Sequence, residues 1–210
     1  MSDLDTKMLA LIMIGGKSTR MGGGIKSFIK FNNKNILDRI IERIEPQIKK
    51  MIINCNSKEE KLEKYQIPII QDVKKGYLGP LAGIHSAMNW VSINEPQIEW
   101  LITIPGDTPF FPKNLVSCFK KKISSKSKII LARSNKKTHP IIGAWNLCLF
   151  SSLNNDIDEG VRKILSWAEL HHIEYIDYQI KKYDPFFNIN RKKDILEAAK
   201  IENNYLLKKT

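Results

Sequence analysis

Six consecutive apolar residues, Leu9 to Ile14, run directly into a glycine-rich and cationic stretch that ends at Lys26. An uninterrupted apolar run closed by glycines is typical of a strand buried on both faces of a parallel sheet. The loops that follow such strands bind ligands in open α/β sheets. Glycines let backbone N–H groups approach an anion closely, and Lys17, Arg20 and Lys26 add positive charge. The stretch therefore predicts a loop that binds phosphate groups.

The spacing of the glycines excludes two common phosphate-binding motifs. A Walker A loop would need a glycine at the position of Leu11, which lies inside the apolar run. The dinucleotide fingerprint G-x-G-x-x-G also fails, because Gly15 and Gly16 are followed by non-glycine residues up to Met21. An ordinary glycine-rich loop in a lysine-rich chain stays open as the alternative on this stretch alone.

Length and charge limit the remaining possibilities. A chain of 210 residues is long enough for one domain with a substantial core. The formal net charge of +12 is compatible with nucleic acid, an anionic membrane or a polyanionic small substrate. The basic residues are mostly lysines in scattered pairs, which is typical of solvated faces rather than of a surface that reads nucleic acid. We therefore expect no nucleic-acid partner.

The cysteines and the N-terminal residues give two further expectations. The three cysteines lie far apart and lack C-x-x-C spacing, so we expect reduced and mostly buried thiols at Cys55, Cys118 and Cys148. The first apolar run is too short for a signal sequence or a membrane span. We expect a soluble, cytoplasmic protein without membrane contact.

Apolar periodicity predicts an alternation of strands and helices, which favours a parallel, doubly wound α/β sheet. The predicted strands are residues 9–14, 27–31, 51–54, 67–70, 98–104, 129–132 and 138–145. The predicted helices are residues 36–48, 59–65, 80–91 and 112–122, and further elements are expected at residues 161–170, 173–178 and 192–203.

Asp107 directly follows the strand predicted at residues 98–104, on the same edge of the sheet as the loop after Leu9–Ile14. A carboxylate opposite a cationic glycine loop suits Mg²⁺, which takes one or two carboxylates together with substrate phosphates. Aspartate in this position also often caps a helix or turns the chain, so that reading stays open.

The segment from Gly15 to Lys26, GGKSTRMGGGIK, resembles the signature loop LAGGxxxRMGxDK of the nucleotidyltransferases, and most closely that of the molybdenum cofactor guanylyltransferases, the MobA family. Further blocks follow in that family's order: GPLAG at residues 79–83, PGDTP at 105–109, HP at 139–140 and NIN at 188–190. Three departures are Met13-Ile14 in place of Leu-Ala, Ile25 in place of Asp, and Gly106 where Cys is common.

The resemblance implies a three-layer α/β/α sandwich with a doubly wound, mostly parallel sheet of the Rossmann-like nucleotidyltransferase type. It implies one domain over residues 1–210, with a GTP-binding N-terminal half and a molybdopterin-binding C-terminal half. The implied reaction transfers GMP from GTP to molybdenum-bound molybdopterin and releases pyrophosphate. The terminal phosphate of the pterin attacks the α-phosphorus, so no nucleophilic side chain is required.

The resemblance also assigns residues to roles. The implied catalytic residues are Arg20, Lys26 and Asp107, of which Asp107 would hold the cofactor Mg²⁺. The implied GTP-binding residues are Met13, Ile14, Gly15, Gly16, Lys26, Asn54, Asp72, Gly79, Pro80, Leu81 and Asp107. The implied molybdopterin-binding residues are His139, Arg162, Asn188 and Asn190. Each of these residues could instead have a purely structural role, as a surface cation, an extended-strand residue, a turn residue or a helix cap.

Two other functions stay open on the sequence. One is a related nucleotidyltransferase that uses CTP or makes a sugar nucleotide. The other is an inactive nucleotide-binding regulator, against which the presence of both Lys26 and Asp107 argues. The family resemblance implies a monomer that meets cofactor-delivery proteins and molybdoenzyme chaperones transiently.

Overall fold

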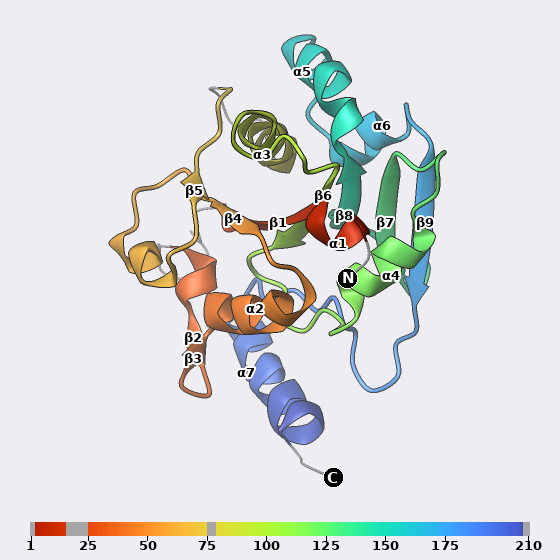
Figure 1. Cartoon of the computed structure of the whole chain (residues 1–210). Helices are drawn as coiled ribbons and strands as arrows, with labels where there is room; N and C mark the ends of the chain where they lie inside the picture. The colour runs from red at the N-terminus through yellow and green to blue at the C-terminus, as the bar shows by residue number, and fades with distance from the viewer. Residues whose placement is uncertain (1–2, 16–24, 75–78, 208–210) are drawn as a thin grey trace.

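The computed structural model describes residues 3–15, 25–74 and 79–207. Its centre is a seven-stranded sheet with the strand order β5-β4-β1-β6-β8-β7-β9 (Figure 1). These strands are β1 (Met8–Met13), β4 (Met51–Asn54), β5 (Ile69–Ile70), β6 (Trp100–Pro105), β7 (Ile129–Ser134), β8 (Lys137–Asn146) and β9 (Ile173–Tyr178). In this sheet β8 pairs antiparallel with both neighbours, whereas the other pairings are parallel. The prediction of a mostly parallel sheet is confirmed.

Helices cover both faces of the sheet (Figure 1). One face carries α2 (Ile36–Ile44), α4 (Leu115–Lys122) and α7 (Lys192–Ile201), and the other carries α3 (Pro80–Asn94), α5 (Phe150–Asp158) and α6 (Ile164–Ala168). A short helix, α1 (Asp3–Thr6), precedes β1. Short 3₁₀ turns span Lys26–Phe28, Glu45–Gln47, Glu60–Tyr65 and Leu147–Leu149, and a π-helical turn, Glu202–Leu206, follows α7. The predicted three-layer α/β/α architecture is confirmed.

The central strand β1 explains why two separate cores form. All six of its residues are buried. Because successive side chains in a strand point to opposite faces, Ala10 and Ile12 join the core beneath α2, whereas Leu9 and Leu11 join the core beneath α3. A strand buried on both faces needs a continuous apolar run, which is the feature that made it visible in the sequence.

The prediction of one strand over residues 27–31 is wrong. Lys26–Phe28 forms a 3₁₀ turn, and the following residues form a small antiparallel hairpin of β2 (Lys30–Phe31) and β3 (Lys34–Asn35). Asn32 and Asn33 turn the hairpin with positive φ angles of 44° and 66°. Asparagine tolerates this left-handed conformation better than most residues, which is why the chain reverses here.

Two further expectations need correction. The element expected over residues 161–170 is the short helix Ile164–Ala168, and α5 before it was not predicted. The cysteines are free, as expected, but Cys148 is exposed and Cys118 is half-buried, so only Cys55 fits the expected burial. Among the described residues, no helix has the length and apolarity needed to cross a membrane.

Candidate active site

A cavity of about 860 Å³ opens at the carboxyl ends of β1, β4, β5 and β6. Small-molecule pockets have volumes of roughly 300 to 1,000 Å³, so a nucleotide-sized ligand fits. Parallel strands end at the same edge of a sheet, and this brings distant parts of the chain together. Of the residues predicted for the site, the cavity is lined by Met13, Gly15, Lys26, Asn54, Asp72, Gly79, Pro80, Asp107 and Asn188. Gly16 and Arg20 lie outside the described residues.

At one end of the cavity lies a charged centre of four residues: Lys26, Asp107 and Asn188, which line the cavity, and Asn190, which contacts Lys26. Lys26 Nζ donates a hydrogen bond to Asn190 Oδ1 (2.5 Å) and lies 3.8 Å from Asp107 Oδ2. Asn188 Nδ2 donates to Asp107 Oδ1 (2.9 Å), and the N–H of Ile189 donates to the carbonyl oxygen of Asp107 (2.9 Å). The NIN segment, which the sequence assigned to the pterin side, therefore contacts both Lys26 and Asp107.

The Asp107 carboxylate is largely buried, with a side chain that is 21% exposed. Burial raises the pKa of Asp107 above its ordinary value, although the charge of Lys26 and the hydrogen bond from Asn188 oppose this change. A buried carboxylate that is only partly compensated favours a further positive charge beside it.

The oxygen atoms at the charged centre fit a magnesium ion. No group of three or more His, Cys, Asp and Glu side chains with metal-binding geometry occurs among the described residues. Mg²⁺ does not need such a cage, because it is commonly held by one or two carboxylates, water and substrate phosphates. Asp107, in a cavity large enough for a nucleotide, provides the protein part of that ligand set.

The other end of the cavity is organised around Asp72. Asn54 Nδ2 donates to Asp72 Oδ1 (3.0 Å), and Asn56 Nδ2 donates to Asp72 Oδ2 (2.7 Å). The N–H of Asp72 donates in return to Asn56 Oδ1 (2.8 Å). Each carboxylate oxygen has a second lone pair, so Asp72 can still accept from a ligand. Sequence reasoning missed Asn56, although its position two residues after the end of the strand at Asn54 could have indicated it.

Lys74 is a second cavity-lining residue that the sequence analysis did not single out. Its Nζ atom contacts both carboxylate oxygens of Asp158 on α5, each at 2.6 Å. The pair ties the segment after β5 to a helix on the α3 face of the sheet, and so supports the loop that carries Asp72.

Two glycines allow a close approach of backbone and side chains around the cavity. A Cβ atom on Gly83 would lie 2.7 Å from Asn54 Oδ1 and 2.8 Å from Met13 Cε. A Cβ atom on Gly106 would lie 2.5 Å from Ser27 Oγ and 2.9 Å from the carbonyl oxygen of Met13. Ser27 Oγ donates a hydrogen bond to the carbonyl oxygen of Gly106 (2.6 Å), so the hydroxyl fills the space that a larger residue at 106 would need.

We predict that Gly106→Ala destabilises the fold by about 1 to 3 kcal/mol, because backbone and side-chain atoms must move to accept the added carbon. Turnover should fall as well, since Gly106 precedes Asp107. Thermal unfolding measures the first effect. Gly15→Ala is the stability control, because no atom lies within 4 Å of a Cβ atom there. Adding Ser27→Gly should recover part of the loss. Equal melting temperatures for Gly106→Ala and the wild type would contradict the crowding argument.

Two predicted nucleotide-binding residues have buried side chains and are not part of the cavity lining. Ile14 is 2% exposed and packs in the core beneath α2, and Leu81 is fully buried in the core beneath α3. The Ile14 N–H donates to the carbonyl oxygen of Asn54. Any contact of these residues with a ligand is therefore restricted to their backbone atoms.

His139 and Arg162 do not line the cavity. The His139 ring packs on Phe186, with 4.7 Å between ring centroids, and its Nε2 atom lies 2.7 Å from Ser134 Oγ. Burial lowers the pKa of His139. Arg162 Nη1 donates to the carbonyl oxygens of Ile157 and Val161. The side chains of His139 and Arg162 thus contact groups outside the charged centre.

A bulge beside His139 brings a different residue into the cavity. Ala132 of β7 pairs with His139, whereas the preceding residue, Leu131, pairs with Gly143, so residues 140–142 have no partner on β7. Ile141 of this bulge lines the cavity. Its carbonyl oxygen accepts from the buried Thr103 hydroxyl on β6 (2.6 Å), which holds the bulge in place.

A doubly wound sheet with a lysine and a carboxylate in a nucleotide-sized cavity at the carboxyl ends of its strands is the arrangement expected of a nucleotide-binding enzyme. Residues 10–173 match the family model described as the MobA-like NTP transferase domain, and the chain belongs to this family. The NIN segment and α7 lie beyond the matched residues.

Individual relatives cover more of the chain. A molybdenum cofactor guanylyltransferase of Nitrobacter hamburgensis is 32% identical over 193 residues, which are 91% of this chain and 92% of that protein. The crystal structure of molybdopterin-guanine dinucleotide biosynthesis protein A from Archaeoglobus fulgidus has a TM-score of 0.74 at 24% identity, covering 93% and 99% of the two chains. A Mycobacterium tuberculosis protein solved as a complex with manganese has a TM-score of 0.62 at 10% identity, covering 92% and 98%. The two structures share the fold.

Proposed function

We propose that this protein transfers GMP from GTP to the terminal phosphate of molybdenum-bound molybdopterin, with release of pyrophosphate. The observation that carries the proposal is one cavity with a lysine and a carboxylate at one end and the Asp72 amide network at the other. This polarity matches a nucleoside triphosphate, whose phosphates need cations and whose base needs hydrogen-bonding groups. The guanylyltransferase relatives support the choice of substrates.

In the proposed reaction an oxygen of the pterin phosphate forms a new bond to the α-phosphorus of GTP. The bond between this phosphorus and the bridging oxygen to the β-phosphate breaks, and the electron pair leaves with pyrophosphate. Lys26 would bind the phosphates and stabilise the charge that develops on the departing group. Arg20 would assist it, as the family resemblance implies.

Asp107 would hold the metal, which we propose to be Mg²⁺. When bound, the ion would neutralise the phosphate charges. Asn188 keeps one carboxylate oxygen of Asp107 in a hydrogen bond, and Asn190 orients Lys26. The N-terminal half would thus bind GTP, while Asn188 and Asn190 would face the pterin phosphate from the C-terminal half, with His139 and Arg162 further away.

We propose that the reaction takes place in the cytoplasm. The free cysteines of the structure support a reducing compartment. The protein would act as a monomer in transient contact with cofactor-delivery proteins and molybdoenzyme chaperones.

Nucleotide choice tests the proposed function. Guanine offers two donors, N1–H and the N2 amino group, to the acceptor Asp72, whereas cytosine does not. We expect GTP to be preferred over CTP by about a hundredfold or more, because a mismatched base leaves a buried polar group unpaired. ITP lacks the N2 amino group and should fall between them. Pyrophosphate release measured with each nucleotide gives the ranking, and equal use of GTP and CTP would reject the guanylyl assignment.

The variant Asp72→Asn tests whether Asp72 recognises the base, separately from whether the protein transfers GMP. An amide at this position would direct donor hydrogens at the Asn54 and Asn56 amides and at guanine. GTP turnover should therefore fall more than ITP turnover, because guanine loses the acceptor for two donors, whereas hypoxanthine loses it for N1–H alone. An unchanged GTP preference in Asp72→Asn would keep the function and remove Asp72 from base recognition.

A further inference from the structure

The C-terminal segment contacts two neighbouring parts of the chain, the 3₁₀ turn that begins at Lys26 and the β2–β3 hairpin that follows it. At the first, Asn190 accepts a hydrogen bond from Lys26, directly before α7 begins. The backbone N–H groups of Asn190 and Arg191 both donate to Asp194 Oδ2 (2.8 Å each), which fixes this end of the helix.

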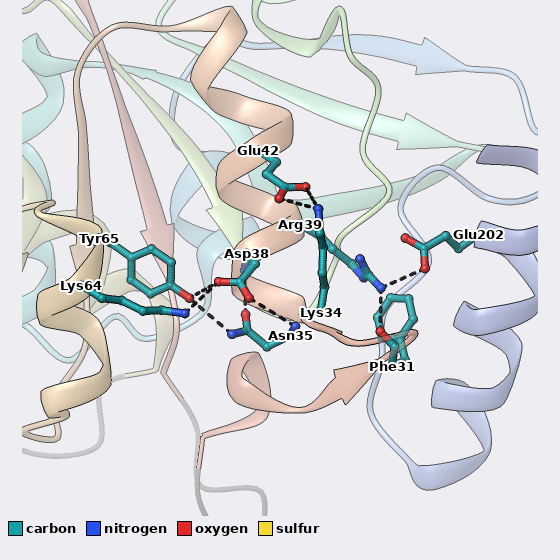
Figure 2. A network of polar contacts seen from close by, with 9 residues as sticks. All are labelled: Phe31, Lys34, Asn35, Asp38, Arg39, Glu42, Lys64, Tyr65 and Glu202. Carbon is teal, nitrogen blue, oxygen red and sulfur yellow. Dashed lines mark hydrogen bonds and ion pairs between the residues drawn. The ribbon is translucent and has the colours of Figure 1, made fainter. Parts of the chain in front are cut away.

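At the second of these parts, Glu202 holds the tip of the hairpin after β2. Glu202 Oε2 accepts from Arg39 Nη2 (2.8 Å) and from Asn32 Nδ2 (2.9 Å). Arg39 Nη2 also donates to the carbonyl oxygen of Phe31 (2.6 Å), and its guanidinium lies 4.0 Å from the centroid of the Phe31 ring. Figure 2 shows Arg39 reaching from α2 to Phe31 and Glu202.

The ion pair between Arg39 and Glu202 is enclosed by protein, since the two residues are 7% and 9% exposed. Replacing such a pair with apolar residues is often neutral or stabilising, so its presence is weak evidence for stability alone. It has a second consequence here. The hydrogen bonds of Glu202 end on Arg39 of α2 and on Asn32 of the hairpin that begins four residues after Lys26.

We propose that Glu202 is a positioning residue for Lys26, acting through the hairpin, and that α7 is the rigid link between Glu202 and Asn190. The proposal rests on the phosphate-binding role of Lys26 in the proposed function. Lysine has a long flexible side chain, and catalysis by positioned charge loses rate when that charge is free to move. Contacts at both ends of α7 hold the backbone of the hairpin and the Nζ atom of Lys26 at once.

A double-mutant cycle tests this link. Glu202→Ala should lower kcat/KM for GTP by roughly tenfold to a hundredfold, as expected when a catalytic group is misplaced. Combined with Lys26→Ala, the same change should have almost no further effect, because no charge remains to be positioned. If Glu202→Ala lowers kcat/KM by the same factor, within about twofold, in the wild type and in Lys26→Ala, the two residues act independently and the proposal is overturned. Glu202→Gln, which keeps an acceptor oxygen for Asn32 and Arg39, should recover part of the activity.

A second measurement excludes simple destabilisation. Val91→Ala removes buried carbon atoms at the far end of α3, in the other core, and is the control for lost stability. In Glu202→Ala, amide hydrogen exchange should increase over residues 26–35, and in Val91→Ala it should not. Equal exchange over these residues in both variants would overturn the proposal.

A phosphate probe keeps the test separate from the proposed function. The dissociation constant for inorganic tripolyphosphate is measured for the wild type, the two single variants and the double variant. Glu202→Ala should weaken this binding in the wild type and have almost no further effect in Lys26→Ala. If the wild type fails to use GTP, the guanylyl assignment falls, while the tripolyphosphate cycle still decides whether Glu202 acts through Lys26.

Discussion

The Asp107→Asn variant should lose turnover by on the order of a thousandfold, because a metal site supplies several kcal/mol of charge stabilisation and each tenfold change in rate corresponds to about 1.4 kcal/mol. The amide keeps the shape of the side chain and the acceptor for Asn188, so the fold should survive. Its stability should even increase, since the replacement removes a buried negative charge whose pKa is raised by burial. Steady-state pyrophosphate release and thermal unfolding measure the two effects.

Asp177→Asn is the matched control for Asp107→Asn. Asp177 is also paired with a cation, Arg133 at 2.8 Å, but it lies outside the cavity and its side chain is 62% exposed. This variant should keep full turnover. Stabilisation by GTP should depend on Mg²⁺ in the control and lose that dependence in Asp107→Asn. Magnesium-dependent turnover of normal size in Asp107→Asn would remove Asp107 from the metal site.

Lys26→Ala should reduce turnover by about a hundredfold or more and weaken GTP binding, as expected when a preorganised charge facing the phosphates is lost. Lys30→Ala is the control, because it removes an exposed lysine from the β2–β3 hairpin, four residues after Lys26, without touching the cavity. Lys26→Arg should recover part of the activity, since it keeps the charge but changes its geometry. If GTP affinity and turnover in Lys26→Ala equal those of the control, Lys26 has no role at the phosphates.

The long buried strands were the predictable part of the fold. β1 is a continuous apolar run and β6 is apolar apart from Thr103, and the strand-end rule was enough to place Lys26 and Asp107 on one edge, where they lie 3.8 Å apart. Pattern reasoning failed where local chemistry decides. The 3₁₀ turn Lys26–Phe28 replaces the first part of the strand predicted at residues 27–31. The helix α5, with the sequence FSSLNNDID, has few strong helix formers and is stabilised by packing against α3 and the sheet.

The site was predictable to the extent that it follows strand ends. Asn188 and Asn190 belong to an irregular segment. Asn188 is 81 residues from its partner Asp107 and Asn190 is 164 residues from its partner Lys26, and such long-range contacts cannot be predicted from the periodicity of the sequence. His139 marked the correct region, yet the bulge that follows turns Ile141 rather than the histidine into the cavity. A bulge depends on the neighbouring strand, here on the Thr103 hydroxyl, and so cannot be deduced from the residues of β8 alone.

The position of β1 has a consequence for biosynthesis. β1 lies between β4 and β6, so the first strand to leave the ribosome has one edge that stays unpaired until residues 100–105 have been made. During that interval a strand of six apolar residues exposes free backbone donors and acceptors, which is a template for association with other chains. The nascent chain therefore carries an association-prone strand edge until β6 has been made.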